Sequence, residues 1–83
     1  MTEAEKKAEL EALLFMATEP IKTAEIKEVT AFDKEEIQDY LAQLEEEYSS
    51  PERGIELVEF NEGYIFQTKA KYKETIKEHH QPE

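Results

Sequence analysis

Hydrophobic residues recur at helical spacing in the first half of this chain and crowd into two short stretches further on. Apolar positions three and four residues apart are typical of a helix with one buried face, whereas short β-branched and aromatic runs around a turn are typical of a hairpin. The order predicted from these patterns is helix, helix, helix, β-hairpin and a short final helix. It is an α+β arrangement that is mainly α.

The first helix is predicted over residues 2–18. Thr2 and Glu5 have the spacing of a capping box at its start. Its inward stripe consists of Leu10, Leu13, Leu14 and Ala17. Phe15 and Met16 lie off this stripe, so the helix has apolar surface on more than one side. Two interpretations stay open for this surplus: a crowded core, or a face that contacts another molecule.

Pro20 separates the first helix from the second, because the residue before a proline is driven out of helical geometry. The second helix is short and is predicted over residues 24–29, with Thr23 as its N-cap. Ile26 and Val29 are three residues apart within it. We expect both of these side chains to point into the core.

The third helix is predicted over residues 33–48, after a brief connection, with Asp33 and Glu36 at capping-box spacing. Its inward stripe consists of Ile37, Tyr40, Leu41, Leu44 and Tyr48. Against a single Lys34, its other surface carries seven carboxylates: Asp33, Glu35, Glu36, Asp39, Glu45, Glu46 and Glu47. We interpret this surface as a solvated face, in preference to a docking site for a basic partner.

The hairpin is predicted from strands at residues 55–60 and 64–68, with Gly63 of the intervening turn at positive φ. Two registers stay open, and a slip of one residue exchanges the two faces. A three-residue loop groups Val58, Phe60, Tyr64 and Phe66 on one face. A two-residue turn groups Val58, Phe60 and Ile65 on one face and Leu57, Tyr64 and Phe66 on the other. In both registers a surplus apolar face remains, and it is a candidate interface.

The last segment, residues 71–79, is predicted to form a short helix with Tyr72 and Ile76 four positions apart. The local positive excess is due to Lys69, Lys71, Lys73 and Lys77. Glutamates interleave with these lysines, so we expect an ordinary solvated helix surface. His79 and His80 are adjacent, whereas helical metal ligands lie three or four residues apart, so no metal site is predicted. The tail from residue 79 onward is expected to be frayed.

Composition restricts the function. A chain of 83 residues makes one domain and buries only roughly 60 to 65% of the surface of its unfolded state, so association would stabilise it. Its net charge of −11 argues against nucleic acid and anionic membranes as direct partners. No signal-peptide pattern and no apolar run of about 20 residues is present. We expect a cytoplasmic protein with no membrane contact.

The residues needed for catalysis are missing from the predicted body. The chain has no cysteine, and its histidines occur only near the end. It has no glycine-rich phosphate loop, and carboxylates on a solvated face lack the desolvated pocket that would tune their pKa values. We therefore expect no enzymatic activity, no cofactor and no small-molecule ligand.

Three stretches together resemble a known family: LEALLFMATEPI (residues 10–21), LEEEY (residues 44–48) and RGIELVEFNEGYIFQTKAKY (residues 53–72). They are similar to the start of bacterial segregation and condensation protein B, in which an "EALLF.A.EP" helix opens the chain and a "RGIEL.E...GY" wing follows the third helix. The resemblance covers residues 10 to about 76. It implies a winged-helix fold with a two-stranded hairpin as its wing.

The resemblance also implies a function. Members of that family have two winged-helix domains, so residues 1–83 are expected to be the single N-terminal domain of a two-domain protein. Members homodimerise, largely through this domain, and bind the kleisin subunit, segregation and condensation protein A. Through the kleisin they join the structural-maintenance-of-chromosomes (SMC) complex in chromosome segregation and condensation. A nucleoid-associated, non-catalytic role is thus implied.

We predict that the dimer or partner interface involves the surplus apolar residues Phe15, Met16, Val58, Phe60 and Ile65. The alternative function is a DNA-binding transcriptional regulator with the same fold, in which the C-terminal lysines would compensate for the acidic third helix. The two hypotheses differ in their partner: the first expects no direct contact with nucleic acid.

Overall fold

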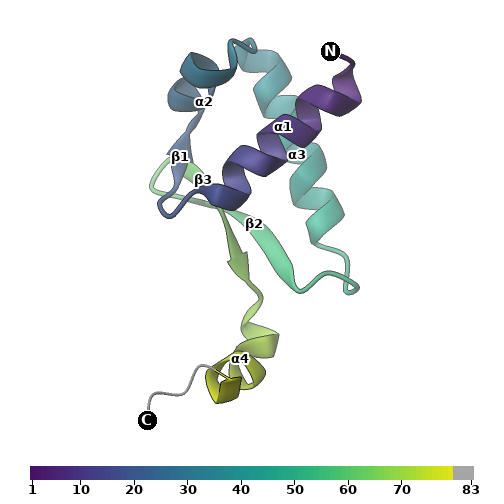
Figure 1. Ribbon diagram of the computed structural model, residues 1–83, viewed down its shortest axis with the longest axis vertical. Coiled ribbons are helices and arrows are strands. Elements are labelled where there is room, and N and C mark those ends of the chain that lie inside the picture. The colour runs from purple at the N-terminus through teal and green to yellow at the C-terminus, as the bar shows by residue number, and fades with distance from the viewer. Residues whose placement is uncertain (80–83) are drawn as a thin grey trace.

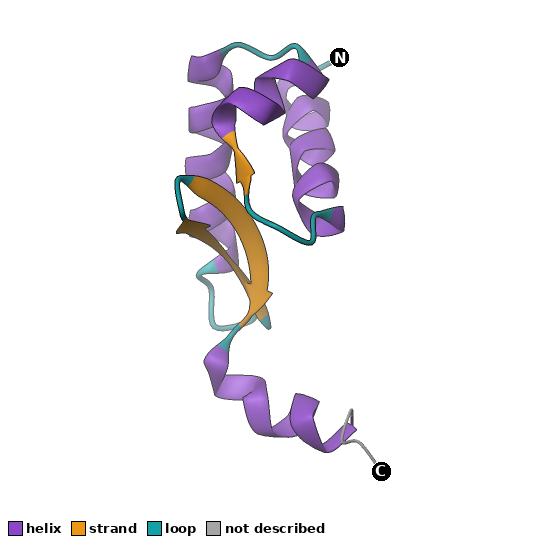
Figure 2. Ribbon diagram, turned by 90° about the vertical axis from the view of Figure 1, so that its left-hand side faces the viewer, coloured by secondary structure: helices purple, strands orange, loops and turns teal. Residues whose placement is uncertain are grey.

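Three helices pack together against one face of a small antiparallel sheet, and a fourth helix projects beyond the sheet (Figures 1 and 2). The computed structural model describes residues 1–79. Its elements are α1 (Glu3–Met16), β1 (Ile21–Lys22), α2 (Thr23–Thr30), α3 (Lys34–Tyr48), β2 (Ile55–Phe60), β3 (Gly63–Thr68), the 3-10 helix η1 (Ala70–Tyr72) and α4 (Lys73–His79). The predicted winged helix is confirmed. Of the tail expected to be frayed from residue 79 onward, His79 is instead the last residue of α4, and the rest lies outside the described residues.

The capping box of α1 is present as predicted. The Glu5 N–H donates to Thr2 Oγ1 at 3.1 Å, and the Thr2 N–H donates to Glu5 Oε1 at 2.8 Å. The helix ends at Met16 rather than at residue 18, because Ala17 already has an extended backbone with ψ 137°. The chain therefore leaves helical geometry three residues before Pro20.

The second helix differs from the prediction at both ends. It begins at Thr23, so Lys22 and not Thr23 is the N-cap, and the Lys22 N–H donates to Glu25 Oε1 at 2.9 Å. Ile26 is fully buried, but the expectation that Val29 points inward is wrong, since 68% of its surface is exposed. Val29 lies in the last turn of α2, and no further turn follows that would continue the apolar face of this helix along the core.

Phe32 belongs to the core although it lies in the connection between α2 and α3. Ala31 adopts a left-handed conformation with φ 64°, which ends α2 and reverses the chain direction. Phe32 then points inward, is 6% exposed, and meets the Tyr40 ring edge to face at 6.2 Å between centroids. A single residue with no periodic neighbours gives no pattern, so the sequence did not predict this.

The core joins α1, α2 and α3 to the sheet. Its buried side chains are Leu10, Leu14, Ile26, Phe32, Ile37, Tyr40, Leu41, Leu44 and Leu57. Four of the five stripe residues predicted on α3 are among them, and the fifth, Tyr48, is half-buried against the Phe66 ring. The stripe predicted on α1 is confirmed at Leu10 and Leu14, while Leu13 and Ala17 are half-buried.

The sheet has a strand that the sequence pattern did not show. Ile21 and Lys22 form β1 and pair with Tyr64 and Gly63, which makes β3 the central strand in the order β1-β3-β2. The sheet is therefore three-stranded rather than a two-stranded hairpin. A strand of two residues has no alternation to detect, so only the tertiary pairing defines it.

The hairpin adopts the two-residue alternative, in which Phe60 pairs with Gly63. The prediction of positive φ at Gly63 is wrong: Asn61 and Glu62 hold the positive angles, at 53° and 66°. Two successive residues with positive φ form a type I′ turn, whose twist suits a tight hairpin. Glycine is therefore needed at position 63 for another reason, which is its packing against Pro20.

Replacing Glu62 with Gly is expected to stabilise the domain by about 1 kcal/mol, because glycine adopts the left-handed conformation without a steric cost. Asn-Gly is also the preferred pair for a type I′ turn. Thermal and urea unfolding would measure the change. A matched Glu59→Gly change within β2 should destabilise the domain, and a destabilised Glu62→Gly chain would contradict this account of the turn.

Candidate interaction surfaces

The residues predicted for an interface are all at least partly accessible. Phe15, Met16 and Phe60 are 69%, 74% and 60% exposed, and Val58 and Ile65 are half-buried. The structure does not bring the five together into one patch. Phe15 lies on an apolar surface beside α1, and Val58, Phe60 and Ile65 lie on the face of the sheet that points away from the helices, while Met16 lines neither.

The outer sheet face holds three of the predicted residues. The register places Val58 opposite Ile65, and Phe60 two positions along on the same face. Together with Pro20, which sequence reasoning did not select, they line a shallow hollow of about 440 Å³. A hydrogen bond of 3.1 Å from Gln67 to Glu56 lies further along this face.

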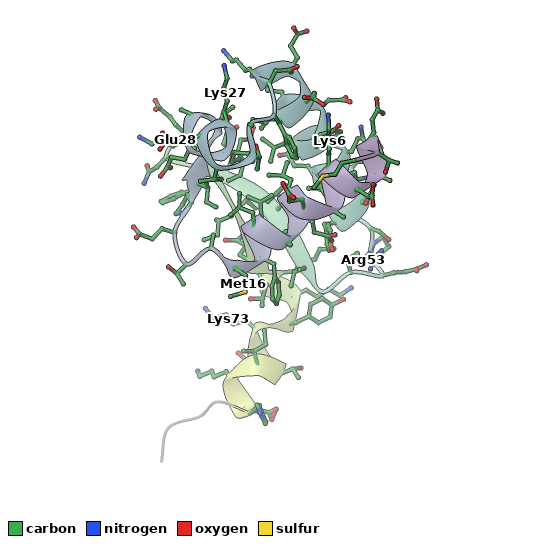
Figure 3. All side chains as sticks on the ribbon, turned by 45° about the horizontal axis from the view of Figure 1, so that its top comes forward. Lys6, Met16, Lys27, Glu28, Arg53 and Lys73 are labelled. Carbon is green, nitrogen blue, oxygen red and sulfur yellow. The ribbon has the colours of Figure 1, made fainter. Side chains whose placement is uncertain are left out.

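The other surface is a groove beside α1, and we call it the α1 groove. It has a volume of about 220 Å³ and is lined by Ala8, Glu11, Ala12, Phe15, Tyr48, Ile55 and Phe66. Of the predicted residues only Phe15 lines it. Met16 follows Phe15 at the C-terminal end of α1, where its side chain extends into solvent (Figure 3). The small alanine side chains on α1 leave space between the helix and the sheet.

Polar contacts order one wall of the α1 groove. The Tyr48 hydroxyl donates a hydrogen bond to the Glu11 carboxylate, and this bond raises the pKa of Tyr48 above its ordinary value. The Arg53 guanidinium lies 5.3 Å from the centre of the Tyr48 ring. The groove therefore has an apolar floor with a carboxylate at its edge. Sequence reasoning missed Ile55 and Phe66 as lining residues because they face the helices yet lie beyond the end of the core.

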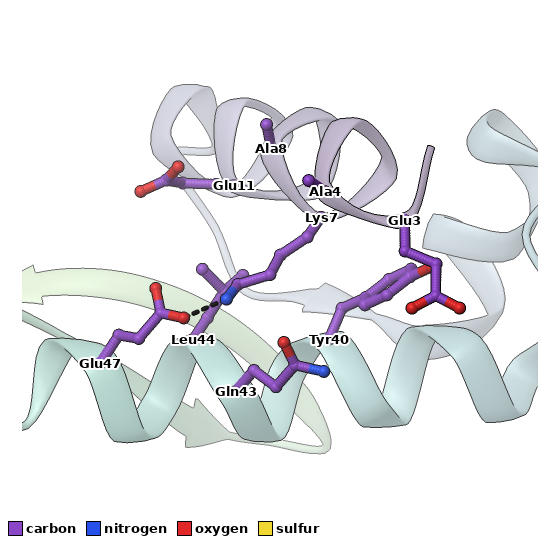
Figure 4. A pocket seen from close by; sticks show the side chains of 9 residues that line it. All are labelled: Glu3, Ala4, Lys7, Ala8, Glu11, Tyr40, Gln43, Leu44 and Glu47. Carbon is purple, nitrogen blue, oxygen red and sulfur yellow. Dashed lines mark hydrogen bonds and ion pairs between the residues drawn. The ribbon is translucent and has the colours of Figure 1, made fainter. Parts of the chain in front are cut away.

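A third hollow, of about 400 Å³, lies between α1 and α3 (Figure 4). Its floor contains Ala4, Ala8 and Leu44, and Lys7 reaches across it to form an ion pair with Glu47. Ala8 and Glu11 line both this hollow and the α1 groove. The ion pair joins the two helices across the hollow, so we assign this hollow a structural role.

A second ion pair joins α1 to the start of α3. Lys6 Nζ lies 2.8 Å from Glu36 Oε2. The hydrogen bond from Lys6, followed by that from the Asp33 backbone N–H, lowers the pKa of Glu36, and the same pairing raises the pKa of Lys6. This carboxylate is thus held charged. It fixes the helix terminus and does not have the raised pKa expected of a general acid.

Other carboxylates of α3 lie on its solvated side. Glu35 and Asp39, together with Asp33 and the ion-paired Glu36, surround a wide, open depression on this side. Within residues 1–79, no group of three or more histidine, cysteine or acidic side chains is arranged to hold a metal ion. The same residues contain no helix that is both long and apolar enough to cross a membrane.

The geometry defines a class of protein: a winged-helix domain whose third helix is acidic and whose apolar surfaces lie on the helix–sheet edge and on the wing. Such surfaces are suited to protein contacts rather than to a DNA groove. The sequence profile of the "Segregation and condensation complex subunit ScpB" family matches residues 8–83. The chain belongs to this family.

Individual relatives agree with the family assignment. Segregation and condensation protein B of Syntrophotalea carbinolica is 36% identical over 80 residues, which are 96% of this chain and 41% of that protein. The protein of the same name from Geobacillus thermodenitrificans is 39% identical over 72 residues, 86% of this chain and 34% of that protein. The chain thus spans between about a third and about two fifths of the length of these relatives.

A solved structure matches the whole domain. The crystal structure of a dimer of the ScpB N-terminal domain complexed with a ScpA peptide has a TM-score of 0.85 and 28% identity. The match covers 100% of this chain and 98% of that one. The fold described above, with its three-stranded sheet and final helix, is therefore that of ScpB N-terminal domains.

Proposed function

We propose that this chain is a homodimerising, kleisin-binding domain of the SMC complex, acting in chromosome segregation and condensation without catalysing a reaction. The observation that carries the proposal is the pair of exposed apolar surfaces on a domain of net charge −11. Monomeric proteins rarely leave such surfaces uncovered. The structural relative that was crystallised as a dimer with a ScpA peptide supports the choice of both partners.

We also propose that the chain provides the first of two winged-helix domains. The matched relatives are more than twice as long, and the chain covers them only in part. Two of the carboxylates, Glu36 and Glu47, form ion pairs with lysines of α1. Carboxylates held in such pairs support a role in assembly.

The two apolar surfaces suit the two proposed partners. We assign the α1 groove, together with the exposed Met16 beside it, to a second copy of the chain. We assign the outer sheet face, with Val58, Phe60 and Ile65, to an apolar segment of the kleisin. The sheet separates these surfaces, so one copy can hold both partners at the same time.

Analytical ultracentrifugation tests dimerisation directly. The purified chain is expected to sediment as a dimer, and its dissociation constant should fall or stay level between about 50 and about 300 mM NaCl. Salt screens the repulsion between two acidic protomers, while burial of apolar surface does not weaken. A dimer that dissociates on adding salt would mean that ion pairs hold it, and a monomer at high concentration would end the proposal.

The alternative, a DNA-binding regulator, predicts a different result. Duplex DNA should then bind at 50 mM salt and be released steeply as salt rises. We expect no shift of a random duplex, because the helix that would enter the groove carries seven carboxylates. A ScpA peptide titrated into the dimer under the same conditions is expected to bind, which distinguishes a protein-binding domain from a folded but inactive one.

A further inference from the structure

The last described segment of the chain stands apart from the rest of the domain. We call η1 and α4, residues 70–79, the C-terminal arm. Both ribbon views show it beyond the end of the sheet, at one end of a molecule that measures 45 by 24 by 21 Å (Figures 1 and 2). None of its residues is buried, and the main contacts of α4 are with η1. A helix this short is marginal in water without a surface to pack on.

The root of the arm is fixed. The Lys69 N–H donates to the Gly54 carbonyl oxygen at 3.0 Å, and Lys69 Nζ donates to the Ser50 carbonyl oxygen at 2.7 Å. These bonds attach the end of β3 to the loop that precedes β2. They determine where the arm leaves the domain, so the arm projects in a defined direction and is available to another molecule.

The arm has an apolar stripe with a charged pattern around it. Tyr72 and Ile76 are both half-buried, and their spacing of four residues places them on one side of the helix. At helical spacing, Lys73 and Lys77 flank this stripe, whereas the two glutamates of α4 fall on the opposite side. A surface that binds the stripe would therefore meet lysines at its edge and leave the acidic side in water.

The rest of the chain has the complementary charge. Residues 1–68 hold 18 of the 21 acidic side chains and 6 of the 10 basic ones, while residues 69–79 hold four lysines and two glutamates. The α1 groove has an apolar floor, and Glu11 is at its edge. Through Glu11 it adjoins the hollow lined by Glu3 and by the ion pair of Lys7 with Glu47. Its apolar floor is complementary to the apolar stripe of the arm, and the acidic Glu11 at its rim is complementary to the lysines.

We propose that the C-terminal arm of one copy docks its Tyr72 and Ile76 side chains in the α1 groove of a second copy, and that the second copy does the same in return. Two identical contacts related by a two-fold axis close the dimer without leaving an open groove. The inference rests on the proposed dimerisation and specifies its contacts. The lysines of the arm reduce the repulsion between the two acidic bodies without reversing it.

Cysteine cross-linking tests the exchange, because the chain has no cysteine of its own. One full-length chain carries Ala12→Cys in the groove, and a second, tagged chain carries Thr75→Cys, which lies beside Ile76 on the arm. Mixed and mildly oxidised, they are expected to form a disulfide between the tagged and untagged chains. The control replaces Ala12→Cys with Glu28→Cys, an exposed position on α2 far from the groove (Figure 3), and should cross-link at least about tenfold less.

A single chain that carries both Ala12→Cys and Thr75→Cys tests the alternative that the arm binds its own groove. A disulfide that closes within a single chain, with little joining of separate chains, would show that the arm folds back on its own groove. That outcome, or no cross-link above the Glu28→Cys control, overturns the proposal. Oxidation of each single-cysteine chain alone shows how much symmetric cross-linking must be subtracted.

Ile76→Asp tests the contribution of the arm to the dimer separately from dimerisation in general. Loss of one buried aliphatic side chain is expected to raise the dimer dissociation constant by about tenfold or more. The far-UV circular dichroism of the body should stay unchanged, because α4 packs against η1 and not against the core. If the parent chain is a dimer and Ile76→Asp leaves its dissociation constant unchanged, the arm proposal fails while the proposed function stands; a monomeric parent chain ends both.

Discussion

A Phe15→Asp chain is expected to sediment as a monomer at concentrations where the parent chain is a dimer. The Phe15 ring is 69% exposed and lines the α1 groove, so the change removes an aromatic side chain from the proposed interface. It also places a carboxylate beside Glu11, where it would repel both Glu11 and the acidic second copy. Aromatic residues at the centre of an interface dominate its energy, and we expect the dissociation constant to rise by about a hundredfold or more.

The fold should survive this change. Because most of the ring lies outside the core, the far-UV circular dichroism of the Phe15→Asp chain is expected to match that of the parent. Loss of helical signal together with mass would show instead that Phe15 supports the core. The matched control is Val29→Asp, which replaces another exposed apolar residue, 68% accessible, on α2 and outside both surfaces. That chain should remain a dimer.

Phe60→Asp distinguishes the two surfaces. Phe60 lies on the outer sheet face, which we assign to the kleisin, so this chain should stay dimeric and lose affinity for a ScpA peptide. Sedimentation and peptide titration on the same two chains, Phe15→Asp and Phe60→Asp, would give opposite results if the assignment holds. If the Phe60→Asp chain is instead monomeric, the dimer contact lies on the outer sheet face and the assignment is wrong.

Gly63→Ala is expected to destabilise the domain strongly, although it adds only one methyl group. A Cβ at this position would lie 2.8 Å from Pro20 Cβ and 3.0 Å from the Pro20 carbonyl carbon. Moving the proline ring or the backbone away would cost free energy, because β1 is paired to β3 at this point. Overpacking of this kind costs about 1 to 3 kcal/mol, or a fall in melting temperature of about 4 to 8 °C for each kcal/mol in a domain this size.

The other glycine of the chain provides the control. A Cβ at Gly54 has nothing within 4 Å, and neither glycine has a positive φ. Gly54→Ala is therefore expected to be neutral or to stabilise the domain by about 0.4 to 1 kcal/mol, through the lower entropy of its unfolded state. Equal losses of stability in the two variants would contradict the proposed steric role of Pro20.

Much of the fold was predictable because its helices are periodic. Leu10, Leu14, Ile37 and Leu44 lie at helical spacing, and burial of their common face leaves little choice of orientation. The capping boxes at Thr2 and Asp33 are local signals that need only four residues to form. These features depend on neighbours in the chain, so they could be predicted before any tertiary contact was known.

The misassigned positions depend on distant residues. Val29 has the spacing of a core residue, yet α2 ends before that face reaches the core, and Phe32 takes part instead. Gly63 has the composition of a turn residue, but its requirement comes from Pro20, more than forty positions away. The five residues predicted for an interface are accessible, and the hairpin register determines that Val58, Phe60 and Ile65 share the outer sheet face, apart from Phe15 on α1.

The amino-acid sequence determined the order of the elements, most of the core and the acidic character that opposes binding to DNA, because these properties follow from spacing and charge along the chain. The tertiary structure decided three further features: β1 joins the sheet, the α1 groove and the outer sheet face are separate, and the C-terminal arm projects from the body. Each of these depends on which strands pair and which side chains lie next to one another. Contacts of that kind leave no periodic signal in the chain.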